Sequence, residues 1–168
     1  MESVLVSSCL LGEAVRYNGA DKRCDHHVLQ RWIREGRVTL VCPEVAGGLL
    51  IPRPPAEIAD GAGGLKVLTG VAKVVDANGR KVSEHFVKGA EQALDLARSR
   101  NIRIAVLKEG SPSCGSSYTY DGSFSGTKTP HPGVTAALLR QAGIHVFSEA
   151  QLEEADSLLK RFEAENAL

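Results

Sequence analysis

Three short apolar segments, each rich in β-branched residues and each followed by a cysteine, constrain this chain more than any other feature. They read VLVSSC at residues 4–9, VTLVC at 38–42 and IRIAVLKEGSPSC at 102–114. Runs of this length that stop at loop residues are typical of buried strands. Because each strand ends shortly before a thiol, the sequence predicts that Cys9, Cys42 and Cys114 belong to one site.

Amphipathic segments alternate with these strands. Apolar residues recur at helical spacing in 28–33, 86–97, 133–142 and 152–162, and a further strand is predicted at 144–147. Asp25, Ser83 and Ser148 are the predicted N-caps. This alternation predicts a Rossmann-like three-layer α/β fold, with a mostly parallel sheet and helices on both faces. Ligands of such sheets bind at the carboxyl ends of the strands, where the cysteines lie.

The composition is that of a single globular domain covering residues 1–168. The chain is 43% hydrophobic and 24% charged, and its 20 basic and 20 acidic residues give no net charge. No global field therefore attracts a polyanion, although the N-terminal third is locally basic. No apolar run approaches the ~20 residues of a membrane span, and residues 1–3 lead into a strand without an export signal. We expect a cytoplasmic protein with no membrane contact.

In a reducing cytoplasm, the four cysteines are better explained as metal ligands, nucleophiles or core residues than as disulfides. Their spacing matches no zinc finger or ribbon. Three thiolates can hold an iron–sulfur cluster and leave one iron open, whereas free cysteines are often simply buried hydrophobes. Their common placement after strands favours a site. Cys24 follows no strand and is expected to take no part in it.

The middle of the chain contains two further stretches. Prolines at 52, 54 and 55 predict an extended path around Arg53, which is expected to bind a substrate carbonyl or, more simply, to pair with Glu57. A flexible glycine-rich loop is predicted at 60–64, and strand-like residues at 66–76 indicate a hairpin or mobile flap outside the main sheet. A turn follows at 76–79.

Four segments resemble the thiouracil desulfidase family, formerly a domain of unknown function. They are SSCLLGEAVRYNG, CPEVAGGLLIPRPPAEI, LKEGSPSCGSSYTYDGSFSG and GVTAALLRQAGIHVFSE, in the family's order over nearly the whole chain. The resemblance implies an iron–sulfur-dependent, metal-binding hydrolase with a 4Fe-4S cluster, and it assigns Cys9, Cys42 and Cys114 as the cluster and metal ligands. Many relatives have a cysteine where this chain has Val15, so that position is no ligand here.

The resemblance also implies a non-redox reaction at the open iron. The sulfur of 4-thiouracil, or of a related thiolated pyrimidine, binds this iron, and water replaces sulfur at C4 to give uracil and sulfide. Glu44, two residues after Cys42, is the candidate general acid/base. Ser111 and Ser113 are candidate catalytic residues that orient water or base. An equally supported interpretation is that their hydroxyls form hydrogen bonds with backbone groups of the loop.

Other residues and other functions stay open at this point. Tyr118, Tyr120 and Phe124 are candidates for stacking on a base, and His131 is a candidate back-up ligand or proton donor. The substrate could instead be 4-thiouridine in tRNA, although the neutral charge favours a free base. A non-catalytic metal-binding module is a further alternative. A Rossmann nucleotide-binding protein is disfavoured, because no G-x-G-x-x-G or P-loop motif occurs. The sequence makes no prediction of the oligomeric state.

Overall fold

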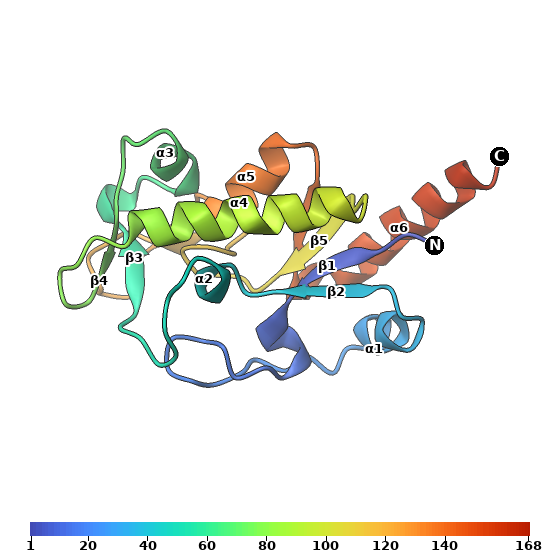
Figure 1. Cartoon of the computed structure of the whole chain (residues 1–168), viewed down its shortest axis with the longest axis horizontal. Helices are drawn as coiled ribbons and strands as arrows, with labels where there is room; N and C mark the ends of the chain where they lie inside the picture. Colours follow the sequence, from blue (N-terminus) through green and yellow to red (C-terminus); the bar gives the residue numbers. More distant parts are fainter.

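The computed structural model describes all of residues 1–168 and is built on a four-stranded parallel sheet, of which Figure 1 labels β1, β2 and β5. The strand order is β2-β1-β5-β8. The strands are β1 (Val4–Ser7), β2 (Val38–Val41), β5 (Ile104–Leu107) and β8 (His145–Ser148). Since Val4 pairs with both Val38 and Ile104, the two strands beside β1 start level with it. The predicted α/β fold with a parallel sheet is confirmed.

Helices cover both faces of this sheet because its central strands are apolar on both sides. Val4 and Val6 pack with Trp32 of α1 (His27–Arg34) and Leu159 of α6 (Leu152–Asn166). Leu5 points the other way, into a core formed with α4 (Ser83–Ser99) and α5 (Val134–Gln141). Successive side chains of a strand alternate between faces, so β1 contributes to both cores. None of the helices combines the length and apolarity needed to cross a membrane.

The helix starts differ from the predicted caps at two of three positions. His26, not Asp25, caps α1, because its Nδ1 accepts a hydrogen bond from the Val28 amide at 3.1 Å. Ser83 is the first residue of α4, and its hydroxyl accepts from the Val74 amide at 2.9 Å instead of capping. Ser148 is an N-cap as predicted, and it forms a capping box with Gln151 at the start of the 3-10 turn Glu149–Gln151 that leads into α6.

A smaller lobe lies at the carboxyl end of the sheet. It contains the antiparallel pair β3 (Ala56–Ile58) and β4 (Val74–Asp76), the 3-10 turn Ala59–Gly61 and the helix α3 (Gly64–Leu68). The predictions that residues 66–76 lie outside the main sheet and that a turn follows at 76–79 are confirmed, but the only strand in this stretch, β4, pairs with β3 across α3 and forms no local hairpin. The prediction of strand-like structure directly after residue 65 is wrong. Val67 packs with Ile58 and Phe86, so burial against α4 decides for a helix over local β propensity.

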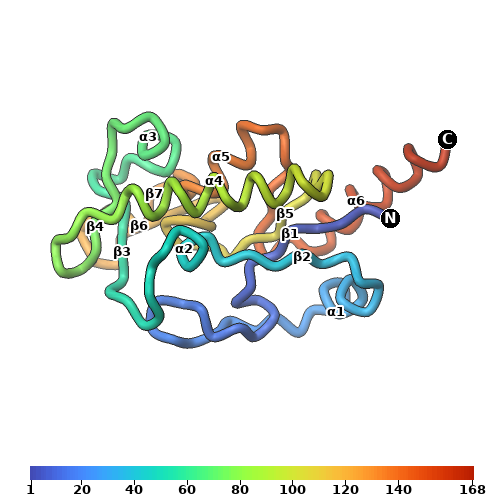
Figure 2. Tube along the Cα trace, in the orientation of Figure 1, coloured from blue at the N-terminus to red at the C-terminus, as the bar shows by residue number.

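The segment 116–132 contains a small hairpin. Its strands are β6 (Thr119–Tyr120) and β7 (Lys128–Thr129), each too short for a periodic signal. Figure 2 shows that this hairpin lies beside β3 although it follows it by many residues. Two further short elements, the 3-10 turn Ser8–Leu11 and the helix α2 (Pro43–Ala46), follow β1 and β2.

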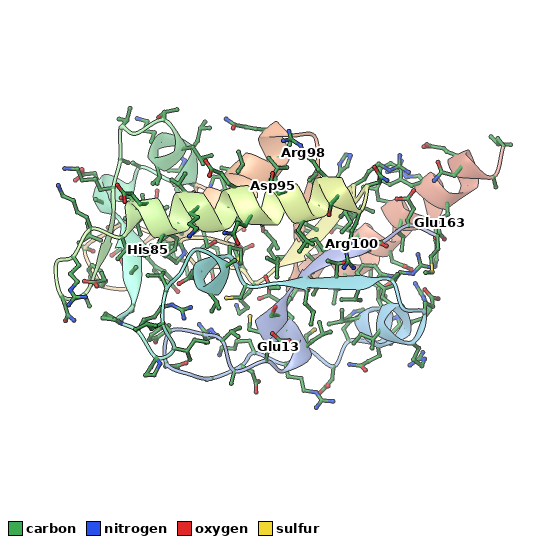
Figure 3. All side chains as sticks on the ribbon, in the orientation of Figure 1. Glu13, His85, Asp95, Arg98, Arg100 and Glu163 are labelled. Carbon is green, nitrogen blue, oxygen red and sulfur yellow. The ribbon has the colours of Figure 1, made fainter.

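The helix α2 is held against α4 by direct contact between their backbones. A Cβ atom on Gly89 would lie 1.9 Å from the carbonyl oxygen of Pro43, and one on Gly47 would lie 1.9 Å from that of His85. The His85 ring, near the start of α4 in Figure 3, also hydrogen-bonds the Gly47 carbonyl through Nδ1 at 2.8 Å. Glycine is therefore required at both positions, and the contact fixes the segment that follows Cys42.

We expect Gly89→Ala to destabilise the protein by about 1–3 kcal/mol through overpacking. A loss of stability in this variant would be diagnostic of the close contact, because alanine in a helix interior is normally about 1 kcal/mol more favourable than glycine. The free energy of unfolding in urea measures the change. The neighbouring Lys88→Ala, at an exposed position of the same helix, is the matched control and should change it by less than about 0.5 kcal/mol. A G89A variant as stable as the wild type would contradict the close contact.

Candidate active site

A cavity of about 530 Å³ opens at the carboxyl ends of β1, β2 and β5. Cys9, Cys42 and Cys114 all line it, as the three strand ends predicted. Cys24 does not line it and instead packs against the core beneath α1 and α6. The structure therefore brings three of the four free cysteines together and leaves the fourth apart.

Each cysteine reaches the cavity through a defined local structure. Cys9 lies in the 3-10 turn after β1, and Cys42 immediately precedes α2. Cys114 lies in the loop after β5, which is docked onto the start of α5. The Val134 amide donates to the Pro112 carbonyl at 2.9 Å, and the Thr135 amide donates to that of Ser113 at 2.9 Å. Free amides at a helix start thus hold the loop that carries the third thiol.

Burial raises the pKa of Cys9 to about 11, and the nearby Cys42 thiol adds to this rise. Burial likewise raises the pKa of Cys42, and burial together with the Cys42 thiol raises that of Cys114. At neutral pH all three are therefore protonated unless a cation binds them. These raised pKa values disfavour a role for any of the three cysteines as a free thiolate nucleophile. Three sulfur donors with mutually unfavourable charges fit a metal centre that takes three cysteine ligands.

Glu44 and Arg53 form a buried ion pair at the wall of the cavity. Their side chains are 16% and 7% exposed, and Nε of Arg53 lies 3.2 Å from Oε1 of Glu44. Burial raises the pKa of Glu44, and the charge of Arg53 only partly offsets this rise. A carboxyl with a raised pKa suits proton transfer near neutral pH.

The expected pairing of Arg53 with Glu57 is wrong. Glu57 instead accepts hydrogen bonds from the amides of Gly122 and Phe124, at 3.0 and 3.2 Å. Arg53 also donates to the Val15 carbonyl at 3.0 Å, so it links the segment after β1 to the segment after β2. The proline-rich segment around Arg53 thus places the Arg53 side chain within reach of both Glu44 and the Val15 carbonyl.

The two candidate serines have different surroundings. Ser111 lines the cavity, and its hydroxyl accepts a hydrogen bond from the Cys114 amide at 2.7 Å. Ser113 is fully buried, does not line the cavity, and shares a hydrogen bond of 2.8 Å with the Thr135 hydroxyl. The position of Ser113 contradicts a catalytic role, because its hydroxyl is turned into the contact between the loop and α5.

Two of the aromatic candidates border the cavity. Tyr118 and Tyr120 line it with their rings 6.0 Å apart in an edge-on arrangement, and Nζ of Lys128 lies 4.3 Å from the centre of the Tyr118 ring. Phe124 is 41% exposed and lies outside the lining. His131 is also outside it, packed against Gly63.

Lys108 and Glu109 are among the charged residues of the cavity that sequence reasoning missed. Nζ of Lys108 lies 2.9 Å from Oε1 of Glu149, which follows β8. Their position was a usable signal, because a charged pair directly after a buried strand must lie at the carboxyl edge of the sheet.

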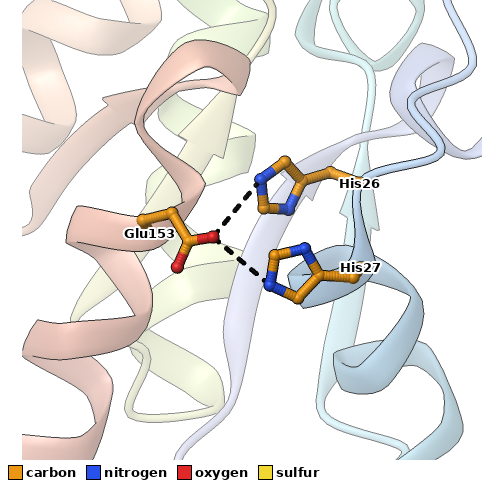
Figure 4. Close-up of side chains that lie close together, drawn as sticks. All are labelled: His26, His27 and Glu153. Atoms are coloured by element: carbon orange, nitrogen blue, oxygen red, sulfur yellow. Dashed lines mark ion pairs between the residues drawn. The ribbon is translucent and has the colours of Figure 1, made fainter.

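A second group of metal-ligand side chains lies away from the cavity, where α1 meets α6 (Figure 4). His26, His27 and Glu153 converge there, with Nε2 of His27 3.2 Å from Oε1 of Glu153. Nδ1 of His26 accepts from the Val28 amide, so the proton of the neutral ring is on Nε2, the atom that faces Glu153. A protonated Nε2 offers no lone pair to a metal. We interpret this group as a polar contact between two helices.

The parallel sheet and the thiol-lined cavity at its carboxyl edge define the class of an α/β protein with a cysteine-rich candidate active site. Residues 4–151 match the sequence profile of the 2-thiouracil desulfurase family, and the chain belongs to this family. The family resemblance identified from four segments of the sequence is thereby confirmed.

Two relatives cover almost the whole chain. YbbK of Bacillus subtilis (strain 168), an uncharacterized protein, is 46% identical over 151 residues, which are 90% of this chain and 98% of YbbK. The solved structure of TudS, a [4Fe-4S]-dependent thiouracil desulfidase, is 47% identical. It superimposes with a TM-score of 0.86 over 95% of this chain and 99% of TudS.

Proposed function

We propose that this protein is an iron–sulfur-dependent desulfidase that converts 4-thiouracil, or a related thiolated pyrimidine, to uracil and sulfide. The observation that carries this proposal is the convergence of three free cysteines, without the fourth, on one cavity beside a buried glutamate. The 47% identity to a thiouracil desulfidase described as [4Fe-4S]-dependent supports the same cofactor and reaction.

In this proposal Cys9, Cys42 and Cys114 hold a 4Fe-4S cluster. When bound, such a cluster would supply Lewis-acid chemistry for the carbon–sulfur bond of the substrate through an iron that has no protein ligand. The charges of Arg16 and Lys108 lower the pKa of Cys9, against the larger effect of burial, and so assist the thiolate form that a ligand requires.

Glu44 is the residue we propose for proton transfer. Arg53 contacts Oε1, which leaves Oε2 to take one proton of the water that attacks C4 and to return it to sulfur as the carbon–sulfur bond breaks. The second water proton leaves to solvent as the C4 hydroxyl becomes the carbonyl of uracil. No electrons are transferred. Ser111 accepts from the Cys114 amide, so its own hydroxyl proton is available to orient that water or the pyrimidine.

We further propose that residues 1–168 act as one domain in the cytoplasm. Support for one domain comes from α4, which contributes to the core of the main sheet through Ala97 and to that of the smaller lobe through Phe86. Support for the compartment comes from the four cysteines, all of them free thiols, as is usual under reducing conditions.

The test is anaerobic turnover of 4-thiouracil by the reconstituted protein, followed by release of uracil and sulfide. We expect multiple turnovers without any added reductant, because the reaction is hydrolytic. A sample with a complete cluster and no turnover of any thiolated pyrimidine would overturn the proposal and leave a non-catalytic metal-binding module.

Thiolated tRNA is the second candidate substrate, favoured by Arg16 and Lys22 at the cavity. The same assay compares free 4-thiouracil with 4-thiouridine in tRNA at low and high salt. We expect faster turnover of the free base at both. Faster turnover of tRNA, with affinity that falls steeply as salt rises, would reverse this order, since phosphate contacts are salt-sensitive.

A further inference from the structure

The carboxylate of Glu109 closes the loop that carries Cys114. Oε1 accepts from the amides of Ser116 and Ser117, at 2.6 and 3.1 Å, and from that of Gly110 at 3.3 Å. Oε2 accepts from the hydroxyls of the same two serines, at 2.7 and 2.8 Å. One side chain therefore joins the beginning of the loop to its end.

The closed loop contains or borders several of the residues that line the cavity. Cys114 and Ser111 lie within it, and Tyr118 follows it directly. The Tyr118 ring packs on the backbone of Gly110, where a Cβ atom would lie 3.0 Å from the phenol oxygen. The hydrogen bonds of Glu109 thus connect Gly110, which lies under the Tyr118 ring, to Ser116 and Ser117, which directly precede Tyr118.

The loop is also joined to the neighbouring strand. Glu149, directly after β8, accepts from the Glu109 amide through Oε2 at 2.9 Å and from Nζ of Lys108 through Oε1 at 2.9 Å. Burial alone would raise the pKa of Glu109, but the hydrogen bonds from Ser116 and Ser117 outweigh it and hold the pKa below its usual value. Glu109 is therefore ionised, as an acceptor of five donors must be.

Glu109 borders the cavity, so it could be taken for a second general base. The donors argue against this, because a carboxylate has about four lone-pair positions and here five donors occupy them. We propose that Glu109 is a positioning residue, which through the loop 109–117 holds Cys114 and Tyr118 in the arrangement that the cluster and substrate require. The part concerning cluster and substrate rests on the proposed function.

Two substitutions separate positioning from proton transfer. In Glu109→Gln the amide oxygen still accepts the backbone amides, and the NH2 group faces two hydroxyls that can accept as well as donate. In Glu109→Ala the whole network is lost. We expect E109A to lose about 10–100-fold in cluster affinity or turnover, as for other residues that orient metal ligands, and E109Q to regain most of it. Equal loss of turnover in both variants, with full clusters, would overturn positioning in favour of proton transfer.

A second measurement does not depend on desulfidase activity. We expect iodoacetamide to alkylate Cys114 of the full-length, cluster-free E109A protein at least about tenfold faster than in the wild type, because protection falls when local structure opens. Cys24, outside the cavity, is the internal control and should react at an unchanged rate. Asp121→Ala is the matched variant, since Asp121 also accepts from a loop amide and hydroxyl, of Ser123, but does not line the cavity.

The outcomes distinguish the two proposals. Faster alkylation of Cys114 alone supports the positioning role even if the wild type turns over no thiolated pyrimidine. Wild-type alkylation rates in E109A would overturn it, whatever the activity. Equal acceleration at Cys24 and Cys114 would also overturn it, because that result means global destabilisation, which a lowered melting temperature would confirm.

Discussion

Replacing Cys9, Cys42 or Cys114 by alanine is expected to remove the cluster, whereas Cys24→Ala leaves it in place. A site with three thiols has no spare ligand, and Cys24 does not line the cavity. The iron and acid-labile sulfide per chain, with the visible spectrum of protein reconstituted without oxygen, measure the change. The wild type and C24A should contain about four of each.

The same three substitutions are expected to lower turnover by at least about 10³-fold. Lewis-acid stabilisation by a metal is worth several kcal/mol in the transition state, and each 1.36 kcal/mol corresponds to about tenfold in rate. C24A serves as the matched control, since it removes a half-buried thiol with no access to the cavity. Loss of the cluster in C24A, or zinc in place of iron in the wild type, would contradict the assignment.

Glu44→Gln is expected to keep the cluster and lose turnover by about 10²–10⁴-fold, the usual contribution of a general acid or base. The amide keeps the shape of the carboxylate and still accepts from Nε of Arg53, so the wall of the cavity is preserved. It cannot take a proton from water. Steady-state kinetics should therefore show the loss in kcat, with KM changed by only a few-fold.

Glu13→Gln is the matched control for this change. Glu13 is exposed, precedes the segment of Val15 and Arg16, and does not line the cavity, so its neutralisation should leave both iron content and turnover unaltered. An E44Q variant that retains iron and full turnover would remove Glu44 from the mechanism. If neither E13Q nor E44Q turned over substrate although both held the cluster, the non-catalytic metal-binding module would become the better explanation.

The family resemblance and the strand ends together anticipated most of the candidate site. Both depend on residues close together in the chain, such as Cys42 and Glu44, which one short segment brings to the cavity. The resemblance and the strand ends could not tell which of Ser111 and Ser113 faces the cavity. These serines are two residues apart in one loop, and only the packing of that loop on α5 turns one hydroxyl to the cavity and the other to Thr135.

The sequence by itself determined the order of the main-sheet strands and of the long helices that cover them, the parallel sheet and the meeting of three thiols at its carboxyl edge. These follow from hydrophobic periodicity and from the handedness of crossovers, which are local or general rules. Tertiary structure alone decided which partner each polar side chain takes. Arg53 pairs with Glu44 instead of Glu57. Residues 64–68 form a helix because burial against elements distant in sequence outweighs their local strand preference. The closure of the Cys114 loop by Glu109 depends in the same way on how that loop folds back on itself.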